Sequence, residues 1–400
     1  MKSFSPYNGE GAPSALGQGE NSLKGQFPLM DILWFMPSMG DSRFLGTNIS
    51  RRNTSPAYLE TVAKAIDSLG YTGALFPTGA GCEDSWVVAA SLIAVTRRMK
   101  FLIAFRPGSL SVTLAARMAS TFDRMSNGRL LINIITGGDP VELAGDGTFL
   151  SHDERYEVTD EFLAVWRQLY TGESVDFEEK HIHIEGGKLL LPPVQRPYPP
   201  LFFGGSSPAA LETAAKHIDV YLSLAEPPAM MKEKFDRMRE LAAKHGRTIR
   251  FGVRAHVFVR ETAEEAWKAA HDVLRYADEK AIAASQSHLA RFDSVGQSRM
   301  VGLHQGGAND LEVSPNLWAG IGLINKGVGT ALVGDPDTLA ERIQEYRDIG
   351  ADTFILSSYP HIEEAYRVAE LLFPRIPDWN AQVGASNTVF NQDTLPRTWQ

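Results

Sequence analysis

The chain has 400 residues, 44% of them hydrophobic and 22% charged, a composition typical of a globular protein with a large core. Its formal net charge of −9 argues against nucleic-acid binding through a general basic surface. No apolar run is long enough to cross a membrane, and the single cysteine, Cys82, excludes an internal disulfide and is consistent with a cytoplasmic location. Residues 1–28, rich in Gly, Ser, Asn and Pro, are expected to form a disordered extension.

From residue 30 onward, apolar strand candidates alternate with helical patterns. The expected strands are 30–36, 73–76, 101–105, 130–136, 201–203, 220–224, 251–259 and 353–357. Most are continuous apolar runs, as in parallel strands covered on both faces. Helical spacing of apolar residues covers 58–69, 161–170, 231–244, 339–349 and 363–373. Eight strands alternating with helices predict an α/β fold, a (β/α)8 TIM barrel over residues 29–376.

A doubly wound open sheet would show the same alternation of strands and helices. Its dinucleotide-binding version needs Gly-x-Gly-x-x-Gly after the first strand, and this chain has no such motif there. The dinucleotide version of the open sheet is therefore excluded, and the barrel is the expected fold.

Two insertions interrupt the alternation. Residues 175–200 predict a hairpin, where His181 and His183 fit the polar face better than a metal site. Residues 290–329, glycine-rich at Gly306 and Gly307, are expected to form a mobile lid that carries Arg299. Residues 377–400 are expected to form a C-terminal tail, which could dock on a neighbouring subunit through its aromatic residues Trp379, Phe390 and Trp399.

The C-terminal ends of barrel strands are where chemistry is expected. Arg254 and His256 lie two residues apart on the strand 251–259, so they point to the same face. A buried arginine needs an anion, either a carboxylate of the chain or a ligand. With Arg106 after the third strand and Arg299 on the lid, three arginines would outnumber the nearby carboxylates. This excess predicts an anionic ligand.

The fifth strand ends in the most readable local motif, two glycines followed by Ser206, Ser207 and Pro208. Glycine lets the backbone approach a ligand, Ser207 can cap a helix, and Pro208 suits its first turn. Exposed N–H groups at that helix start favour a phosphate, although a plain capped helix would show the same pattern. His152 and Tyr156, near the start of another helix, could reach the same phosphate or a sugar across the barrel mouth.

Ordered motifs from about residue 31 to 373 resemble those of the bacterial-luciferase-like flavin monooxygenases, most closely the FMNH2-dependent alkanesulfonate monooxygenases. The motifs are Thr78-Gly-x-x-Cys-Glu-Asp84, Asp123-Arg-Met-Ser-Asn-Gly-Arg129, Thr136-Gly-Gly-Asp-Pro140, Glu142-Leu-Ala-Gly-Asp-Gly147, His152-x-Glu-Arg-Tyr156, Gly204-Gly-Ser-Ser207, Lys232-Glu-Lys234, Asp293-Ser-Val-Gly-Gln297, Ser314-Pro-Asn-Leu-Trp318 and Tyr359-Pro-His361.

The resemblance implies a two-component system. A separate NAD(P)H-dependent flavin reductase would supply reduced FMN, which with O2 would oxidise the carbon of an organosulfonate and release an aldehyde and sulfite. The implied flavin contacts are Cys82, Asn133, Thr136, His152, Tyr156, Ser206 and Ser207. The implied sulfonate and catalytic pocket consists of Arg254, His256, Arg299, Tyr359 and His361. Homo-dimers or tetramers are also implied.

General chemistry agrees with these assignments. A sulfonate is a permanent anion, which suits the guanidinium of Arg254, and the imidazole of His256 could act as a base. At two positions, Met39 and Leu224, the related enzymes typically carry histidine and tryptophan respectively. Both should lie at the barrel mouth, and the loss of two rings favours another organosulfonate, such as the sugar sulfonate sulfoquinovose. A non-catalytic flavin carrier and a deazaflavin-dependent dehydrogenase are the other readings.

Overall fold

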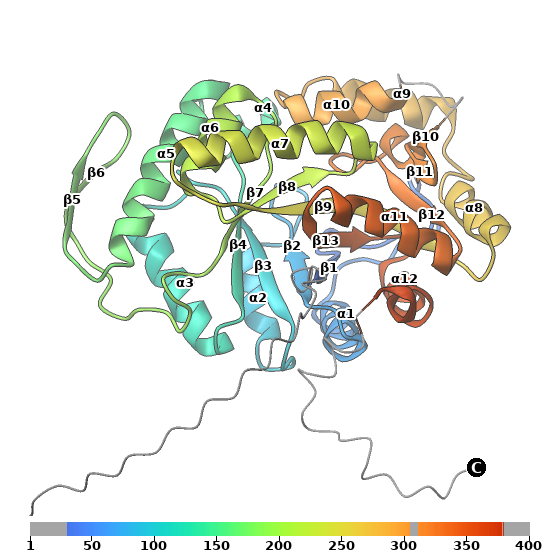
Figure 1. The fold of residues 1–400 in the computed structure, drawn as a ribbon, viewed down its shortest axis with the longest axis horizontal. Coiled ribbons are helices and arrows are strands. Elements are labelled where there is room, and N and C mark those ends of the chain that lie inside the picture. Colours follow the sequence, from blue (N-terminus) through green and yellow to red (C-terminus); the bar gives the residue numbers. More distant parts are fainter. Residues whose placement is uncertain (1–29, 305–310, 378, 380–400) are drawn as a thin grey trace, which may run out of the picture.

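The computed structural model describes residues 30–304, 311–377 and 379 (Figure 1). The expected extension 1–28, the Gly306-Gly307 pair, and Phe390 and Trp399 of the tail lie outside the described residues.

A closed barrel of parallel strands forms the centre of the molecule. Its strands run in the order β9–β13–β1–β2–β3–β4–β7–β8, and β8 pairs back onto β9. They are β1 (Asp31–Phe35), β2 (Gly73–Phe76), β3 (Lys100–Phe105), β4 (Leu130–Ile134), β7 (Leu201–Phe203), β8 (Val220–Leu224), β9 (Arg250–Val259) and β13 (Ala351–Ser357). The predicted TIM barrel is confirmed, because each expected strand is a barrel strand.

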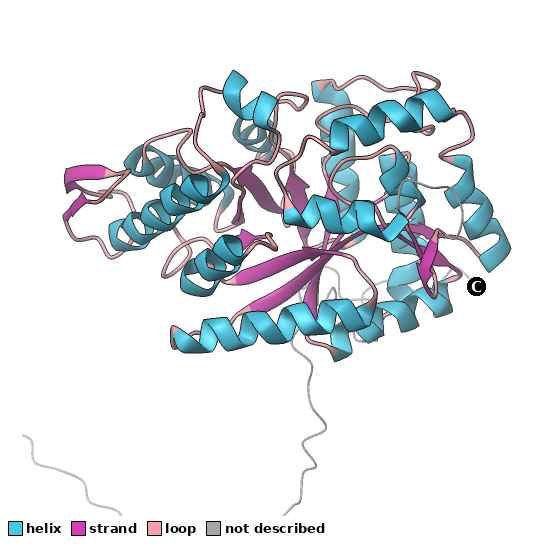
Figure 2. Ribbon diagram, turned by 90° about the horizontal axis from the view of Figure 1, so that it is seen from above, coloured by secondary structure: helices cyan, strands magenta, loops and turns pink. Residues whose placement is uncertain are grey.

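Helices enclose the barrel, as the view in Figure 2 shows. They are α1 (Pro56–Leu69), α2 (Ser85–Leu92), α3 (Val112–Ser126), α4 (Pro140–Gly145), α5 (His152–Leu169), α6 (Pro208–His217), α7 (Pro228–Lys244), α8 (Ala263–Asp272), α9 (Glu279–Leu289), α10 (Val295–His304), α11 (Pro336–Asp348), α12 (His361–Arg367), η2 (Val368–Leu372) and η3 (Phe373–Arg375). Many begin after a capping side chain, such as Ser55 of α1 or Asp335 of α11. Among the described residues, no helix is both long enough and apolar enough to cross a membrane.

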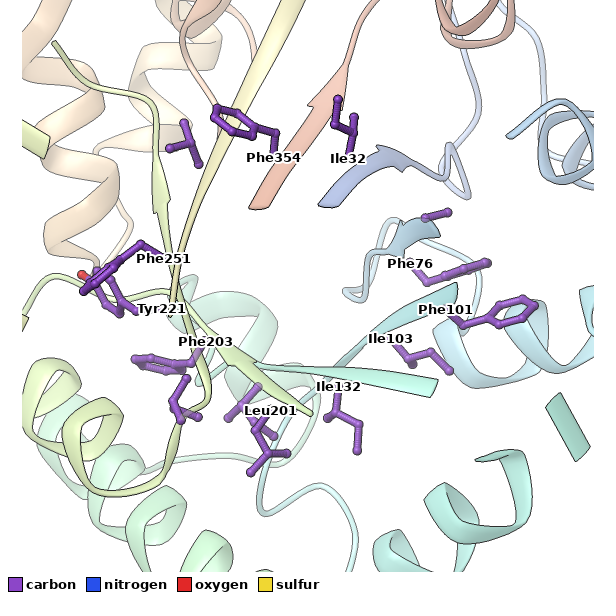
Figure 3. Close-up of a cluster of buried hydrophobic side chains, with 14 of the residues drawn as sticks. Ile32, Phe76, Phe101, Ile103, Ile132, Leu201, Phe203, Tyr221, Phe251 and Phe354 are labelled. Atoms are coloured by element: carbon purple, nitrogen blue, oxygen red, sulfur yellow. The ribbon is translucent and has the colours of Figure 1, made fainter. Parts of the chain in front are cut away.

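Alternation along the strands divides the core into two layers. Residues such as Phe101, Phe203 and Phe354 belong to the large cluster between the strands and the helices, part of which Figure 3 shows. A smaller cluster fills the barrel interior with Leu33, Phe35, Leu75, Leu102, Leu131, Phe202, Val220, Leu222 and Ile355. On β9 the residues with outward partners are Val253, Ala255 and Val257, so Arg254 and His256 face the interior. Polar side chains therefore stand directly above an apolar interior.

The first insertion forms two antiparallel strands, β5 (Val175–Glu178) and β6 (His183–Gly187), which project from the body at the left of Figure 1. The His181 ring nitrogen lies 2.8 Å from Glu157, and that of His183 lies 3.1 Å from Glu185. Both histidines therefore belong to the polar surface around this hairpin.

The second insertion has more regular structure than expected. Its described residues form α10, β10 (Glu312–Ser314), β11 (Leu317–Trp318) and the 3-10 helix η1 (Gly320–Leu323), and β12 (Ala331–Gly334) follows directly. β12 pairs in parallel with the last four residues of β9, from His256 to Val259. The insertion thus leads into a strand that extends the barrel sheet beside the residues expected to do chemistry. Trp379, from the predicted tail, is buried, and its ring centroid lies 4.7 Å from that of Phe373.

Candidate active site

Arg254 faces the barrel interior, in register with Leu224, the last residue of β8, and with Ile355 of β13. Its guanidinium carbon lies 5.0 Å from the centroid of the Phe35 ring, and its Nε has no hydrogen-bond partner. Burial lowers the pKa of Arg254 to about 10, and the groups that oppose this shift are Tyr359 and Cys82, with no carboxylate among them. At neutral pH this is a cation without a counterion from the described residues.

His256 lies two residues after Arg254 on β9, on the same face of the strand, and is buried. Its Nδ1 lies 2.9 Å from the Ser357 hydroxyl, and its Nε2 lies 3.4 Å from the amide nitrogen of Asn325. Burial, aided by His361 and Arg254, lowers the pKa of His256 to about 3. The imidazole is therefore neutral at physiological pH, and one of its two ring nitrogens carries a lone pair.

Tyr359 and His361 complete an aromatic wall beside this pair. Ring centroids are 5.2 Å apart for His256 and Tyr359, and 5.1 Å apart for Tyr359 and His361. Burial raises the pKa of the Tyr359 hydroxyl, which stays protonated. His361 stacks on Phe35 at 5.5 Å, and its main-chain N–H donates to buried Asp41 at 2.9 Å. The four predicted residues Arg254, His256, Tyr359 and His361 thus form one cluster, assembled from β9 and the end of β13.

The expected excess of arginine over carboxylate is wrong for two of the three arginines. Arg299 of α10 donates from Nε and Nη2 to Glu226, each at 2.7 Å, and Lys234 approaches the same carboxylate at 3.1 Å. Arg106 forms ion pairs with Glu142 at 2.7 Å and Asp146 at 2.5 Å. Arg254 alone of the three keeps an unpaired charge, so the argument for an anion rests on this residue.

Glu226 was not among the predicted site residues, because only cations at strand ends indicate an anionic ligand. It follows β8 directly, and it is almost completely buried. A census of acidic residues at strand ends would have found it. Asp41, which follows β1 and anchors His361, was missed for the same reason. Asn325 had no signal at all, since its contacts join positions far apart in the chain.

The predicted phosphate motif has the expected local geometry. The Ser207 side chain accepts from the Ala210 N–H at 3.2 Å and so caps α6, whereas Ser206 is only partly buried. At Gly204 a Cβ atom would lie 2.9 Å from the Leu222 carbonyl oxygen, so a side chain would displace the backbone. Gly204 is exposed at the end of β7, just before the start of α6, and close packing against β8 restricts this position to glycine.

Aromatic rings connect the start of α5 to this strand end. The His152 and Tyr156 ring centroids are 5.0 Å apart, and Tyr156 packs edge-on against Phe203 at 6.3 Å. Both side chains therefore lie beside the Gly204–Ser207 loop. An exposed strand end, a helix start and two polar rings are compatible with an anionic group such as a phosphate.

The remaining candidates border the same end of the barrel. Asn133 and Thr136, on and after β4, are both partly exposed, and Cys82 is close enough to Arg254 to interact electrostatically. Burial raises the pKa of the Cys82 thiol, so this residue stays protonated. Leu224 is partly exposed in register with Arg254, and Met39, after β1, is 40% exposed. An apolar leucine therefore stands next to the unpaired cation.

A closed parallel barrel with a cation, a neutral imidazole and an open strand end at one mouth is an enzyme-like architecture. Residues 30–353 match the model of the luciferase-like monooxygenases, and the chain belongs to this family.

Solved structures of related folds include a riboflavin lyase containing modified FMN and riboflavin, with 19% identity, a TM-score of 0.73, and coverage of 87% of this chain and 91% of that one. An EDTA monooxygenase from Chelativorans sp. BNC1 has 16% identity, a TM-score of 0.70, and coverage of 89% and 98%. A coenzyme F420-dependent tetrahydromethanopterin reductase from Methanopyrus kandleri has 17% identity, a TM-score of 0.62, and coverage of 87% and 99%. At these identities the matches show a shared barrel fold.

Proposed function

We propose that this protein is a flavin-dependent monooxygenase that removes the sulfonate group from an organosulfonate. Reduced FMN, supplied by a separate NAD(P)H-dependent reductase, and O2 would provide the oxidising power. The single observation that supports a sulfonate substrate is Arg254, whose charge has no carboxylate partner and whose Nε has no acceptor. A group that is anionic at every working pH is the natural complement of such an arginine.

The flavin phosphate would bind at the start of α6. Hydrogen-bond donors would come from the exposed main chain at Gly204 and the partly buried hydroxyl of Ser206. The dipole of α6 adds positive potential, and Ser207 caps this helix. His152 and Tyr156 would border the phosphate and ribityl chain. Asn133, Thr136 and Cys82 would lie along the flavin toward the barrel axis. The riboflavin lyase with modified FMN, which shares the barrel fold, supports this assignment.

Arg254 would bind the sulfonate oxygens and orient the adjacent carbon toward the flavin. His256, neutral and with one nitrogen free of a hydrogen, would accept a proton from that carbon. The protonated hydroxyl of Tyr359 would donate to the developing negative charge. Overall, the carbon gains one oxygen atom of O2 and loses sulfite, and the second oxygen atom leaves as water.

Met39 and Leu224 support a sugar sulfonate over a linear alkanesulfonate. Leu224 stands in register with Arg254, so a side chain smaller than tryptophan leaves volume next to the bound sulfonate. This volume would accept a ring such as that of sulfoquinovose.

Sulfite release tests the proposal directly. Purified protein, a flavin reductase, FMN and NADH would be incubated in air with methanesulfonate, octanesulfonate, taurine or sulfoquinovose. We expect release from at least one sulfonate, fastest from sulfoquinovose. A faster reaction with octanesulfonate would remove the sugar-sulfonate assignment, and no release from any of the four would remove the role given to Arg254.

The F420-dependent neighbour raises a second enzyme function, a deazaflavin-dependent dehydrogenase. Tight binding of reduced FMN, followed by O2 consumption, is expected of the monooxygenase. Binding of F420 with no affinity for FMN would instead support the dehydrogenase.

A further inference from the structure

Asn325, in the loop between η1 and β12, contacts two members of the Arg254 cluster at once. Its amide nitrogen Nδ2 lies 3.4 Å from His256 Nε2 and 3.2 Å from the Tyr359 hydroxyl oxygen. An amide nitrogen carries two hydrogens and no acceptor site, so each contact requires the partner to accept. The insertion therefore supplies hydrogen-bond donors to two residues of the barrel.

The backbone around Asn325 is held from both sides. The Gly322 N–H donates to the Gly329 carbonyl at 2.9 Å, and a Cβ at Gly329 would lie 3.2 Å from the Gly322 Cα. The Gln286 side chain donates to the Gly322 carbonyl at 3.0 Å, and the side-chain oxygen Oε1 of Gln297 accepts from the Gly327 N–H at 2.8 Å. The two ends of the loop, at Gly322 and Gly329, therefore lie close together, and side chains of α9 and α10 hydrogen-bond to its backbone. These contacts fix the position of the Asn325 side-chain amide.

The same contact places the proton of His256. A donor at Nε2 requires that this nitrogen carry a lone pair, and a neutral ring then has its hydrogen on Nδ1. Ser357 Oγ lies 2.9 Å from Nδ1 and can accept that hydrogen. With Asn325 donating on one side and Ser357 accepting on the other, the ring has one preferred proton arrangement.

We infer that Asn325 is a positioning residue that holds His256 in the Nδ1–H form, with the lone pair of Nε2 directed toward the loop side of the site. The inference deepens the proposed function, on which the catalytic value of that lone pair rests. The consequence is that the proton arrangement of His256 depends on the insertion loop, and that the Asn325 amide has to move aside before Nε2 can accept a proton. Tyr359 gains from the same amide, because its oxygen accepts there and its own hydrogen stays free for a ligand.

Other charged and titratable groups around His256 do not supply this information. Arg254 on β9 and His361 on α12 both disfavour a cationic imidazole, and Asp41 acts on His361 and Tyr359. These groups favour the neutral ring but do not select which nitrogen keeps the hydrogen. Hydrogen bonds make that selection. The Ser357 hydroxyl, the main-chain groups of Ser357 and Val328, and the Asn325 amide all interact with the ring. Of these, Asn325 is the side chain that can be changed without altering a barrel strand.

The test is a measurement of the His256 proton position by long-range 1H–15N correlation spectra on the full chain, labelled with 15N-histidine, without flavin or substrate. The chain has 10 histidines, and the spectrum of His256→Gln identifies the signal of interest. Three further variants are compared: Asn325→Asp, which replaces the donor by an acceptor; Asn325→Ala, which removes it; and Asn48→Asp, a matched change at an exposed asparagine.

We expect the Nδ1–H pattern in the wild type and in Asn48→Asp. Asn325→Asp should transfer the hydrogen to Nε2, and Asn325→Ala should give a mixture. In sulfite release, Asn325→Ala should lower kcat about tenfold, the equivalent of one lost hydrogen bond, with little change in KM. An Nε2–H pattern in the wild type, or an unchanged His256 signal in both Asn325 variants, would overturn the inference. The spectra need no substrate, so a protein without sulfonate activity would still give this answer.

Discussion

The two sides of the barrel mouth are built in different ways. On the phosphate side, from Gly204 to Ser207, a strand end, a cap and a helix start follow one another within a few residues, and the cap closes at 3.2 Å. On the side proposed to bind the sulfonate, the sulfonate side, His256 takes its partners from Ser357 and Asn325, 101 and 69 residues away in the chain. The first side is encoded locally and the second by the closure of the barrel, so substitutions should separate binding of cofactor from handling of substrate.

The largest effect is expected on the sulfonate side from Arg254→Ala. Removing the partner of a largely desolvated anion costs about 3–5 kcal/mol, which lowers kcat/KM for sulfite release roughly 200- to 5,000-fold. Binding of reduced FMN, measured by fluorescence quenching, should change little. Arg254→Lys, which keeps the charge, is the control and should recover part of the loss. If Arg254→Ala keeps most of the activity of the wild type, the sulfonate binds elsewhere.

Glu226→Gln removes the ion pair that links Arg299 of α10 to the end of β8, and so tests how strongly the insertion is held to the barrel. Arg299 and Lys234 would then face a neutral amide near a site that is almost completely buried in the native protein. Because Arg299 is partly exposed, we expect a loss of about 2 kcal/mol in the free energy of unfolding, below the usual cost of breaking a fully buried pair. Urea denaturation measures it. A stability equal to the wild type would show that the pair contributes nothing.

Stability at acid pH should depend on His256. Its pKa lies near 3 in the folded protein and at 6.5 ordinarily, so between these values the unfolded chain binds a proton that the native protein does not. The free energy of unfolding should therefore fall as the pH drops below about 6.5, by at most about 1.4 kcal/mol per pH unit from this residue. His256→Gln should make the decline shallower. An identical pH dependence in both proteins would mean that His256 is not held neutral.

The smallest effects are expected from the two serines of the phosphate side. Ser207→Ala removes the cap of α6 and should lower stability by about 1 kcal/mol. Ser206→Ala should instead weaken FMN binding about fivefold, since a single hydrogen bond is lost while the fold is unaffected. Thermal unfolding and flavin titration on both variants give the contrast. If Ser206→Ala lowers stability and leaves flavin affinity unchanged, the hydroxyl is structural.

The sequence was sufficient for the barrel because most of its strands are continuous apolar runs and several helices between them show helical spacing of apolar residues. It also placed Arg254, His256, Tyr359 and His361 together, since strand ends of a barrel converge on one mouth. Which carboxylates pair with the arginines at the barrel mouth could not be predicted from the sequence. Glu226 meets Arg299 across 73 residues, and Arg106 meets Glu142 across 36, and only the fold determines these pairs. Long-range hydrogen bonds such as those of Asn325 were out of reach for the same reason.

The partner exchange along β9 has a consequence for how such proteins diversify. β8 pairs with β9 from Arg250 to Arg254, and β12 takes over the same edge from His256 onward. Thr330 closes the joint, because its hydroxyl donates to the Ala225 carbonyl at 2.8 Å and its own carbonyl accepts from the His256 N–H at 3.0 Å. The segment that follows the insertion therefore joins the sheet at one defined position, where the pairing partner of β9 changes from β8 to β12. Exchanging residues 290–329 would then alter what reaches Arg254, while the strand end at Gly204 and the start of α6 keep their own architecture.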